Sequence, residues 1–279
     1  MTIQQAAAAW FASLRLNRRS QKTIQWYAMW LADLQRSLLF DDVSQVSLGD
    51  LRAWLAGLYT RNLKPASVHG AARTVKAFFR WCLAEGLRPD DPTTRLEMPS
   101  LPKRIPKPLS TNALQQMINV AAGSQNPQRD QALILFMADS GVRLAELCGL
   151  QVGDVDLGSC SAIVVGKGDQ ERFVFFSDET ARALAAWLTV RPSSVENLFG
   201  LRYHSVAGLL RRLAKRAHVE ERVHPHALRK TAATKYAAIV DVHTLKAIFG
   251  WSQLETSEFY VSHSRARLAE RARAALQNK

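Results

Sequence analysis

A proline-rich stretch near the middle of the chain restricts its folds more than any other feature of the sequence. Residues 87–109 read LRPDDPTTRLEMPSLPKRIPKPL and hold six of the ten prolines in the 279-residue chain. Prolines at this density cannot continue a helix and favour extended backbone. The pattern predicts a linker over 87–109 between two domains, residues 1–86 and 110–279, each long enough for its own core.

The first domain is expected to be helical throughout. Helical periodicity covers four segments, with serine or proline near three of their starts: 2–15, 20–37, 47–61 and 65–86. On the last segment an apolar stripe occupies one face, and another face carries Arg73, Lys76 and Arg80. This basic face is either solvated surface or an edge that faces phosphates, and the positive charge of the whole chain favours the second interpretation.

The second domain is expected to combine helices with a few strands. Two short runs rich in β-branched and aromatic residues, 161–165 and 171–176, flank a GKGDQ turn, which indicates a hairpin. Helical patterns precede and follow it: 110–122, 127–140, a short one from 143, then 178–190, 202–218, 225–239, 242–249, 255–261 and a basic one from about 265 to 279. The expected fold is mainly α with a small antiparallel β-hairpin or sheet, a four-helix domain followed by a mixed α+β domain.

The charge balance indicates the kind of partner. The chain has a net charge of +13 and a pI near 10.1. Such an excess favours a polyanion, nucleic acid first and an anionic membrane surface second. The basic residues of the linker, Lys103, Arg104 and Lys107, suit a segment that lies along a polyanion.

Several other classes of protein are disfavoured. The longest apolar runs, such as 132–138, are too short to span a membrane, and the N-terminus lacks the charge order of a secretory signal. The three cysteines have no metal-ligand spacing, and His224 and His226 have no third ligand nearby. The GKG turn lacks the spacing of a nucleotide-binding P-loop. We expect a cytoplasmic, DNA-associated protein that uses no metal and no other cofactor.

The stretch HPHALRK at 224–230 predicts a helix start that gathers hydrogen-bond donors. Pro225 suits the first turn of a helix, and His226 and Arg229, three residues apart, share one face. A donor-rich face at a helix N-terminus suits an anion. On this stretch alone, a solvated basic face is an equally good interpretation.

Four separated stretches resemble, in order and spacing, the tyrosine recombinases of the phage integrase family. They are SGVRLAELCGL (140–150), VGKGDQERFV (165–174), HPHALRK (224–230) and FGWSQLETSEFY (249–260). The resemblance implies a helical core-binding domain in 1–86 and a catalytic domain in 110–279. It also implies a site-specific recombinase that cleaves and rejoins double-stranded DNA through a 3′-phosphotyrosyl intermediate.

Carried over residue by residue, the resemblance implies six active-site residues and three supporting ones: Arg143, Lys167, His226, Arg229, Trp251 and the nucleophile Tyr260, with Glu146, Lys230 and His263 in support. These residue types suit the chemistry. Attack on a DNA phosphodiester creates a doubly negative pentacovalent phosphate, which preorganised donors stabilise. A tyrosine nucleophile stores the energy of the broken bond in a phosphotyrosyl ester, so resealing needs no cofactor.

The resemblance also suggests individual roles. Lys167 would protonate the departing 5′-hydroxyl, and His226 would help to ionise the tyrosine. Glu146 would orient the cluster. Two residues depart from the usual pattern, because Lys230 stands where many members have a second histidine and Trp251 replaces the commoner histidine, as it does in Cre-like enzymes. Which group takes the tyrosine's proton therefore stays open.

The alternatives concern both single residues and the whole chain. Tyr236 is the nearest competitor of Tyr260 in the sequence, Trp251 could be a core aromatic, and Lys167 could be a solvated lysine in an ordinary hairpin. A catalytically silent DNA-binding protein of the same fold would not need all six residues. A type IB topoisomerase-like enzyme shares much of the chemistry, but the compact helical first domain favours recombination.

The family resemblance finally implies an assembly. The last helix, at about 265–279, docks on a neighbouring subunit in this family, and four protomers then hold two duplexes. We therefore expect a homotetramer on paired DNA sites, with a second recombinase as a further candidate partner. The alternative is that the narrow apolar stripe of this helix packs against its own domain.

Overall fold

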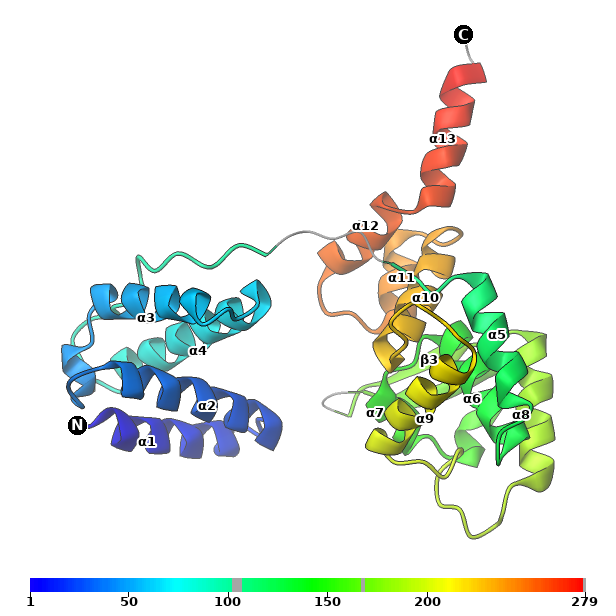
Figure 1. Ribbon diagram of the computed structural model, residues 1–279, viewed down its shortest axis with the longest axis horizontal. Coiled ribbons are helices and arrows are strands. Elements are labelled where there is room, and N and C mark those ends of the chain that lie inside the picture. Colours follow the sequence, from blue (N-terminus) through cyan, green and yellow to red (C-terminus); the bar gives the residue numbers. More distant parts are fainter. Residues whose placement is uncertain (102–106, 167–168, 278–279) are drawn as a thin grey trace. The chain divides into compact units, whose positions relative to one another are not determined.

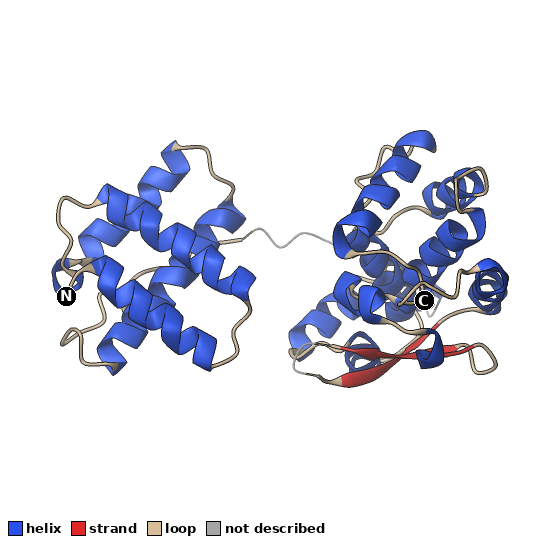
Figure 2. Ribbon diagram, turned by 90° about the horizontal axis from the view of Figure 1, so that it is seen from below, coloured by secondary structure: helices blue, strands red, loops and turns tan. Residues whose placement is uncertain are grey.

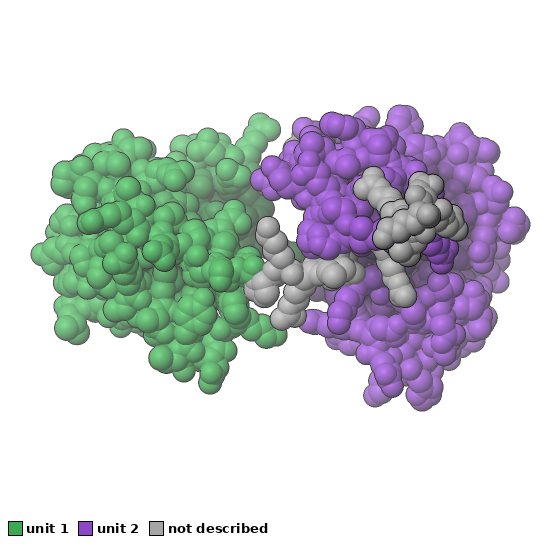
Figure 3. Space-filling model, turned by 90° about the horizontal axis from the view of Figure 1, so that it is seen from above, with its two compact units in different colours: residues 1–104 green, residues 105–279 purple. Residues whose placement is uncertain are grey.

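The computed structural model describes residues 1–101, 107–166 and 169–277. They form two compact units, Met1–Arg104 and Ile105–Lys279, which Figure 3 colours separately. The expected fold class is confirmed, because helices dominate both units and the strands form one small sheet in the second (Figure 2). None of the helices among the described residues is both long and apolar enough to cross a membrane.

Residues 1–101 contain four α-helices and a short 3-10 helix: α1 (Ile3–Leu16), α2 (Gln21–Ser37), η1 (Val43–Gln45), α3 (Leu48–Thr60) and α4 (Pro65–Ala84) (Figure 1). The first three α-helices begin after a hydroxyl side chain that accepts a first-turn N–H, and α4 begins at a proline. Their apolar faces form one core, whose largest buried members include Trp10, Leu34, Phe78 and Phe79.

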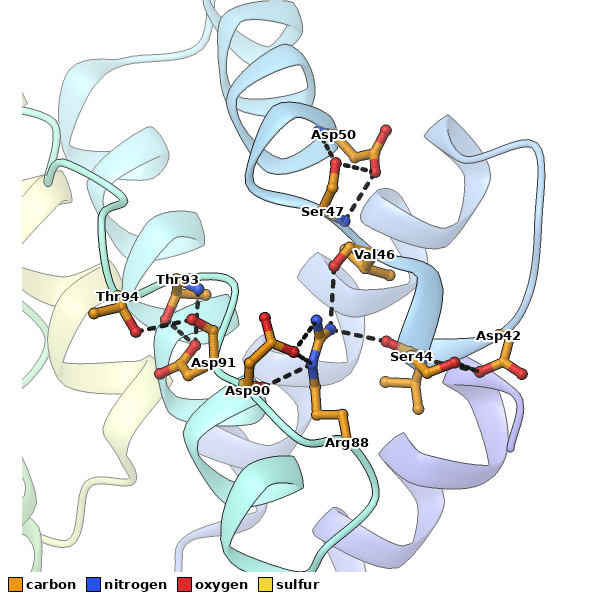
Figure 4. Close-up of polar contacts among 11 residues, drawn as sticks. Asp42, Ser44, Val46, Ser47, Asp50, Arg88, Asp90, Asp91, Thr93 and Thr94 are labelled. Carbon is orange, nitrogen blue, oxygen red and sulfur yellow. Dashed lines mark hydrogen bonds and ion pairs between the residues drawn. The ribbon is translucent and has the colours of Figure 1, made fainter.

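The proline-rich segment is folded onto the first unit over much of its length. Arg88 is 6% exposed, and its guanidinium donates to the carbonyls of Val43 (2.9 Å) and Val46 (3.1 Å) and pairs with Asp90 at 3.0 Å. Figure 4 shows these contacts. Leu96 joins the core of the unit. The backbone carbonyls near η1 need donors, and a buried arginine supplies several at once.

The other end of the segment belongs to the second unit. Leu109 is buried in that unit's core, and its N–H donates to the Thr231 hydroxyl at 2.9 Å. The predicted linker over 87–109 was therefore too long at both ends. Proline density reveals where a helix cannot continue, but it does not reveal which extended residues pack against a neighbouring core.

The second unit contains helices around a small sheet. Its α-helices are α5 (Thr111–Ala121), α6 (Pro127–Ser140), α7 (Leu144–Gly149), α8 (Asp178–Val190), α9 (Tyr203–Arg216), α10 (Pro225–Ala237), α11 (Val242–Phe249), α12 (Leu254–Ser262) and α13 (Arg265–Gln277). A 3-10 turn, η2 (Val152–Asp154), precedes the first strand. These bounds agree with the expected segments to within a few residues.

The described residues of this unit form one antiparallel sheet in the order β1-β2-β3. The strands are β1 (Val155–Asp156), β2 (Ser161–Val165) and β3 (Glu171–Phe175). The hairpin of β2 and β3 is confirmed, with Ile163 opposite Phe173. Strand β1 was not predicted, because two residues are too few to show a strand's alternation.

Helix α6 organises the core of the second unit. It packs against α5, α8 and α10, and all of its residues from Ala132 to Ala138 are buried. It ends at Gly141, whose φ of +59° is left-handed, and a Cβ there would lie 2.4 Å from the Phe249 ring. This close approach brings the chain just before Arg143 against the end of α11.

Candidate active site

Arg143 and Glu146 form a local pair at the start of α7. Arg143 is the N-cap residue, and its backbone N–H donates to one Glu146 oxygen while its guanidinium donates to the other, both at 2.7 Å. Arg172 of β3 pairs with the same carboxylate at 2.7 Å. Burial opposes ionisation of Glu146, but the charge of Arg172 and the hydrogen bonds from Arg143 outweigh it and lower the pKa of the carboxyl.

The end of α11 holds three guanidinium groups. Three consecutive carbonyls there accept from three different arginines: Ile248 from Arg172, Phe249 from Arg229 at 2.6 Å, and Gly250 from Arg143 at 2.6 Å. The last carbonyls of a helix have no partner within the helix and carry its negative dipole end. They therefore hold the three guanidinium groups in place.

Arg229 is the most enclosed of these cations. It is 5% exposed, donates also to the Gly141 carbonyl at 2.5 Å, and its Cζ lies 5.1 Å from the centre of the Phe249 ring. Burial, followed by the like charges of Arg143 and Arg172, lowers the pKa of Arg229 to about 9. The guanidinium still carries its charge at neutral pH, and an incoming anion would relieve this repulsion.

Four of the six predicted residues line one cavity of about 450 Å³: Arg143, His226, Arg229 and Trp251. They come from three stretches of the sequence that the fold brings together. His224 and Tyr203, for which no catalytic role was predicted from the sequence, also line this cavity. For His224, the helix-start pattern of HPHALRK was the available signal. For Tyr203, the only signal in the sequence was its position in the first turn of a predicted helix.

The two histidines lie side by side at the start of α10. The Nδ1 of His224 caps the helix by accepting the Ala227 N–H at 3.2 Å, so its Nε2 carries the proton in the neutral ring. The His226 ring lies 6.4 Å from that of His224. Desolvation and then the charges of Lys230 and Arg229 lower the pKa of His226. It is therefore neutral at pH 7 and able to accept a proton.

Tyr260 of α12 packs directly on the cavity wall. Its half-buried ring stacks on Trp251, with centroids 5.2 Å apart and planes 16° apart. Burial raises the pKa of Tyr260, and the charge of Arg229 opposes the rise. The competing Tyr236 directs its hydroxyl to the Phe175 carbonyl at 3.4 Å and does not line this cavity.

The remaining predicted residues are placed less directly. Lys167 lies outside the described residues, but its neighbour Gly166 lines a second cavity of about 740 Å³ together with Arg143, Arg172 and Trp251. Lys230 is half-buried on α10.

His263 sits at the end of α12. Its Nδ1 lies 2.9 Å from the Phe259 carbonyl, and its ring lies 4.4 Å from the Phe259 ring. This contact ties the last turn of the helix that contains Tyr260.

The three predicted DNA-contacting residues of the first unit, Arg73, Lys76 and Arg80, line one cavity. Arg73 and Arg80 are exposed, and Trp26 and Lys22 also line this cavity, which has a volume of about 550 Å³. Lys76 lines the same cavity, and its ammonium group also donates to the carbonyls of Thr93 and Leu96, both at 2.8 Å. Two of its three donors are thus used to hold the segment after α4, a role that the helix periodicity could not predict.

Of the basic linker residues, Lys107 is described and exposed. Lys103 and Arg104 lie outside the described residues.

Known proteins resemble both units. Residues 107–267 match the phage integrase family, and residues 7–86 match the phage integrase N-terminal SAM-like domain. The chain is 32% identical over 268 residues to the tyrosine recombinase XerC of Corynebacterium efficiens, covering 92% of this chain and 86% of that protein. It is 31% identical over 245 residues to the tyrosine recombinase XerC of a Mycobacterium species (strain KMS), covering 81% and 82%.

Solved structures share the fold. The integrase of the transposon Tn1549, in complex with transposon right end DNA, superposes with a TM-score of 0.78 at 20% identity, over 99% of this chain and all of that chain. A lambda integrase dimer bound to a core site gives a TM-score of 0.75 at 18% identity, over 96% and 97%. With the matches over both units, these findings confirm the resemblance: the chain belongs to the phage integrase family, as a tyrosine recombinase.

Proposed function

We propose that this chain cleaves and rejoins double-stranded DNA at specific sites, with Tyr260 as the nucleophile. The observation that carries the proposal is the cavity lined by Arg143, His226, Arg229 and Trp251, with the Tyr260 ring stacked on its wall. A cavity lined by two guanidinium groups, an imidazole and an indole N–H suits a phosphodiester, and a hydroxyl beside it suits attack on phosphorus.

The reaction would proceed by exchange of one phosphodiester bond for another. The Tyr260 oxygen attacks the phosphorus, the bond to the 5′-oxygen breaks, and a 3′-phosphotyrosyl ester and a free 5′-hydroxyl result. His226, whose lowered pKa leaves it neutral, would take the phenol proton. Lys167 would supply a proton to the 5′-oxygen. Attack by a 5′-hydroxyl of a second strand reverses these steps and seals the exchanged product.

The arginines would stabilise the transition state. Arg143 and Arg229 each use two N–H groups on Glu146 or on backbone carbonyls. A guanidinium has five N–H donors, so each retains others for phosphate oxygens. Because the site already holds them in position, little reorganisation is needed when charge develops.

The nucleophile is tested by matched tyrosine variants. Tyr260→Phe keeps the ring that stacks on Trp251 and should bind DNA normally while forming no covalent adduct on nicked duplexes that carry a candidate site. Tyr236→Phe is the control, because it removes a hydroxyl from the same unit that points to the sheet. Adduct formation by Tyr260→Phe, or its loss in Tyr236→Phe alone, would contradict the assignment.

Strand exchange separates recombination from the rival activities. The wild-type chain should exchange strands between two duplexes that carry the site. Relaxation of supercoiled DNA without exchange would support the topoisomerase-like alternative. Specific binding without any adduct would support a silent binding protein.

We further propose that the chain assembles as a tetramer on two DNA sites through α13. Among the described side chains of the helix, Arg267 donates to the carbonyls of Ala238 (3.3 Å) and Val240 (2.5 Å), while Leu268 is 52% exposed. Figure 1 draws α13 with no other element alongside it. A helix of this length is marginal alone and gains stability when its apolar side is buried, which a neighbouring subunit would provide.

Truncation tests the assembly. Deleting residues 268–279 retains Arg267 and its two hydrogen bonds, so single-site binding should stay intact while assembly on paired sites and strand exchange are lost. Leu268→Glu, which keeps the helix length, should weaken assembly in the same direction. A normal tetrameric complex of the truncated chain in analytical ultracentrifugation would show that α13 serves its own unit. The same assay with an added second recombinase would reveal a mixed complex.

A further inference from the structure

We propose that His224 is a further catalytic residue, whose Nε2–H donates to one non-bridging oxygen of the scissile phosphodiester. The inference rests on the proposed function, because it assigns a role to a second histidine of the same cavity. The family resemblance implied no role for His224, which stands two positions before His226 in the sequence.

His224 lies on the wall of the cavity that would take the phosphate. It lines this cavity of about 450 Å³ together with Arg143, Arg229 and His226. The rings of His224 and His226 are nearly parallel, with planes 15° apart and centroids 6.4 Å apart. The two imidazoles thus stand side by side, and a phosphate that enters the cavity meets both.

The start of α10 determines which nitrogen of His224 can donate. The Ala227 N–H donates to Nδ1 at 3.2 Å, so the proton of the neutral ring is on Nε2. Because Nε2 lies across the ring from Nδ1, it is directed away from the end of the helix. No described residue forms a hydrogen bond with Nε2. The cap therefore leaves one fixed donor for a ligand in the cavity.

His224 and His226 are suited to different tasks. Burial, followed by the charges of Arg222 and Lys230, lowers the pKa of His224, so the ring is neutral at pH 7. The only acceptor atom of this neutral ring, Nδ1, is already used by the helix. His224 can therefore bind an oxygen, but it cannot take the phenol proton as His226 would.

A neutral donor suits this place in the site. Burial and the like charges of Arg143 and Arg172 already lower the pKa of Arg229. A further cation on the cavity wall would add to that repulsion, whereas an imidazole N–H adds a hydrogen bond without another charge. Fixed donors of this kind stabilise the negative oxygens of a pentacovalent phosphate.

Serine at position 224 separates the donor from the helix cap. Serine is a preferred N-cap residue and accepts the same backbone N–H, so His224→Ser retains the start of α10 and removes the ring donor. His224→Thr, another capping residue, replaces it if the serine variant does not fold. His224→Ala removes both donor and cap, and its additional loss of melting temperature relative to His224→Ser measures the cap alone.

The test compares the rates of adduct formation on three nicked duplexes that carry the candidate site. One has the ordinary scissile phosphate, and two are the phosphorothioate isomers in which sulfur replaces one or the other non-bridging oxygen. Sulfur retains the negative charge but accepts hydrogen bonds weakly. Rate constants are measured in single turnover at saturating protein, so that differences in DNA affinity drop out and slow isomers still give a value.

His224→Ser should show an effect that depends on the isomer. On the ordinary phosphate, and on the isomer that keeps the contacted oxygen, it should reduce the rate roughly 10- to 100-fold, as the loss of one such donor does. On the other isomer it should reduce the rate less than about threefold, because the acceptor is already lost from the substrate.

His243→Ser is the matched control. His243 also lies in the first turn of a helix of the second unit, but it is exposed and lines neither cavity of the site. Its replacement should leave the rate unchanged on all three duplexes.

The outcomes separate this inference from the proposed function. A wild-type rate for His224→Ser on the ordinary phosphate would show that His224 only caps α10. The same reduction on both phosphorothioate isomers, or on neither, would also overturn the contact with one oxygen. A wild-type chain that forms no adduct would overturn the proposed function itself. A reduction that disappears on one isomer alone would establish the contact.

Discussion

Replacing Gly250 by alanine should damage the site far more than the fold. Gly250 has a φ of +56°, and an added Cβ would lie 2.8 Å from Arg172 Cδ, 3.1 Å from its Nε and 3.5 Å from Arg143 Nη1. A left-handed conformation costs an L-residue about 1–2 kcal/mol. The first of these distances is too short for a carbon–carbon contact, so Arg172 or the turn must move as well.

The effect on cleavage follows from what would move. Arg172 and Arg143 are each bound to Glu146 and to a carbonyl at the end of α11. A shift of several tenths of an ångström would therefore displace a guanidinium that, in the proposed reaction, binds the phosphate. Misplacement on the order of 1 Å costs about a hundredfold in rate, so we expect adduct formation by Gly250→Ala to slow by roughly 10- to 100-fold.

Gly86→Ala is the control for backbone strain. Gly86 also follows a helix and has a φ of +67°, but a Cβ there would meet nothing within 4 Å. Both variants should lose about 1–2 kcal/mol of folding stability in their own unit, measured by thermal unfolding. Only Gly250→Ala should lose cleavage of nicked DNA. If Gly250→Ala lost the same stability but cleaved DNA at the wild-type rate, the idea that the arginines must keep their positions would be refuted.

Three further predictions concern the chemistry and the DNA contact. Lys167→Ala should cleave normal DNA slowly but recover most of its rate when the leaving 5′-oxygen is replaced by sulfur, which departs without a proton; equal loss on both substrates would leave Lys167 as a phosphate contact. Because desolvation and nearby cations lower the pKa of His226, the second-order rate constant of adduct formation should be flat at neutral pH. The rate constant should fall as the pH drops below the ordinary pKa range of histidine and the base becomes protonated. A fall of the same size in His226→Gln would exclude His226 as the base. Replacing Lys103, Arg104 and Lys107 together should flatten the plot of log binding constant against log salt by roughly two to three units; an unchanged slope would show that these residues do not contact the backbone of the DNA.

Much of the fold could be predicted from the sequence because the signals are local. The hydroxyl caps of α1 to α3, the prolines that open α4, α6 and α10, and the GKGDQ turn act on residues within one turn of themselves. The family motifs between Arg143 and Tyr260 can be read directly from the sequence, because they follow one another in the family's order and spacing. The start of α10 at Pro225, with His226 and Arg229 facing one cavity, follows from the same local rules.

Contacts between distant segments were decided by the tertiary structure alone. Lys76, which is predicted to contact DNA, also holds the carbonyls of Thr93 and Leu96. Arg172 looked like an ordinary strand residue, yet it donates to Ile248, 76 positions later. Sequence periodicity predicts which way a side chain points along its own helix or strand. It does not reveal which buried carbonyl or carboxylate of another segment will lie opposite, because those partners exist only once the segments have packed together.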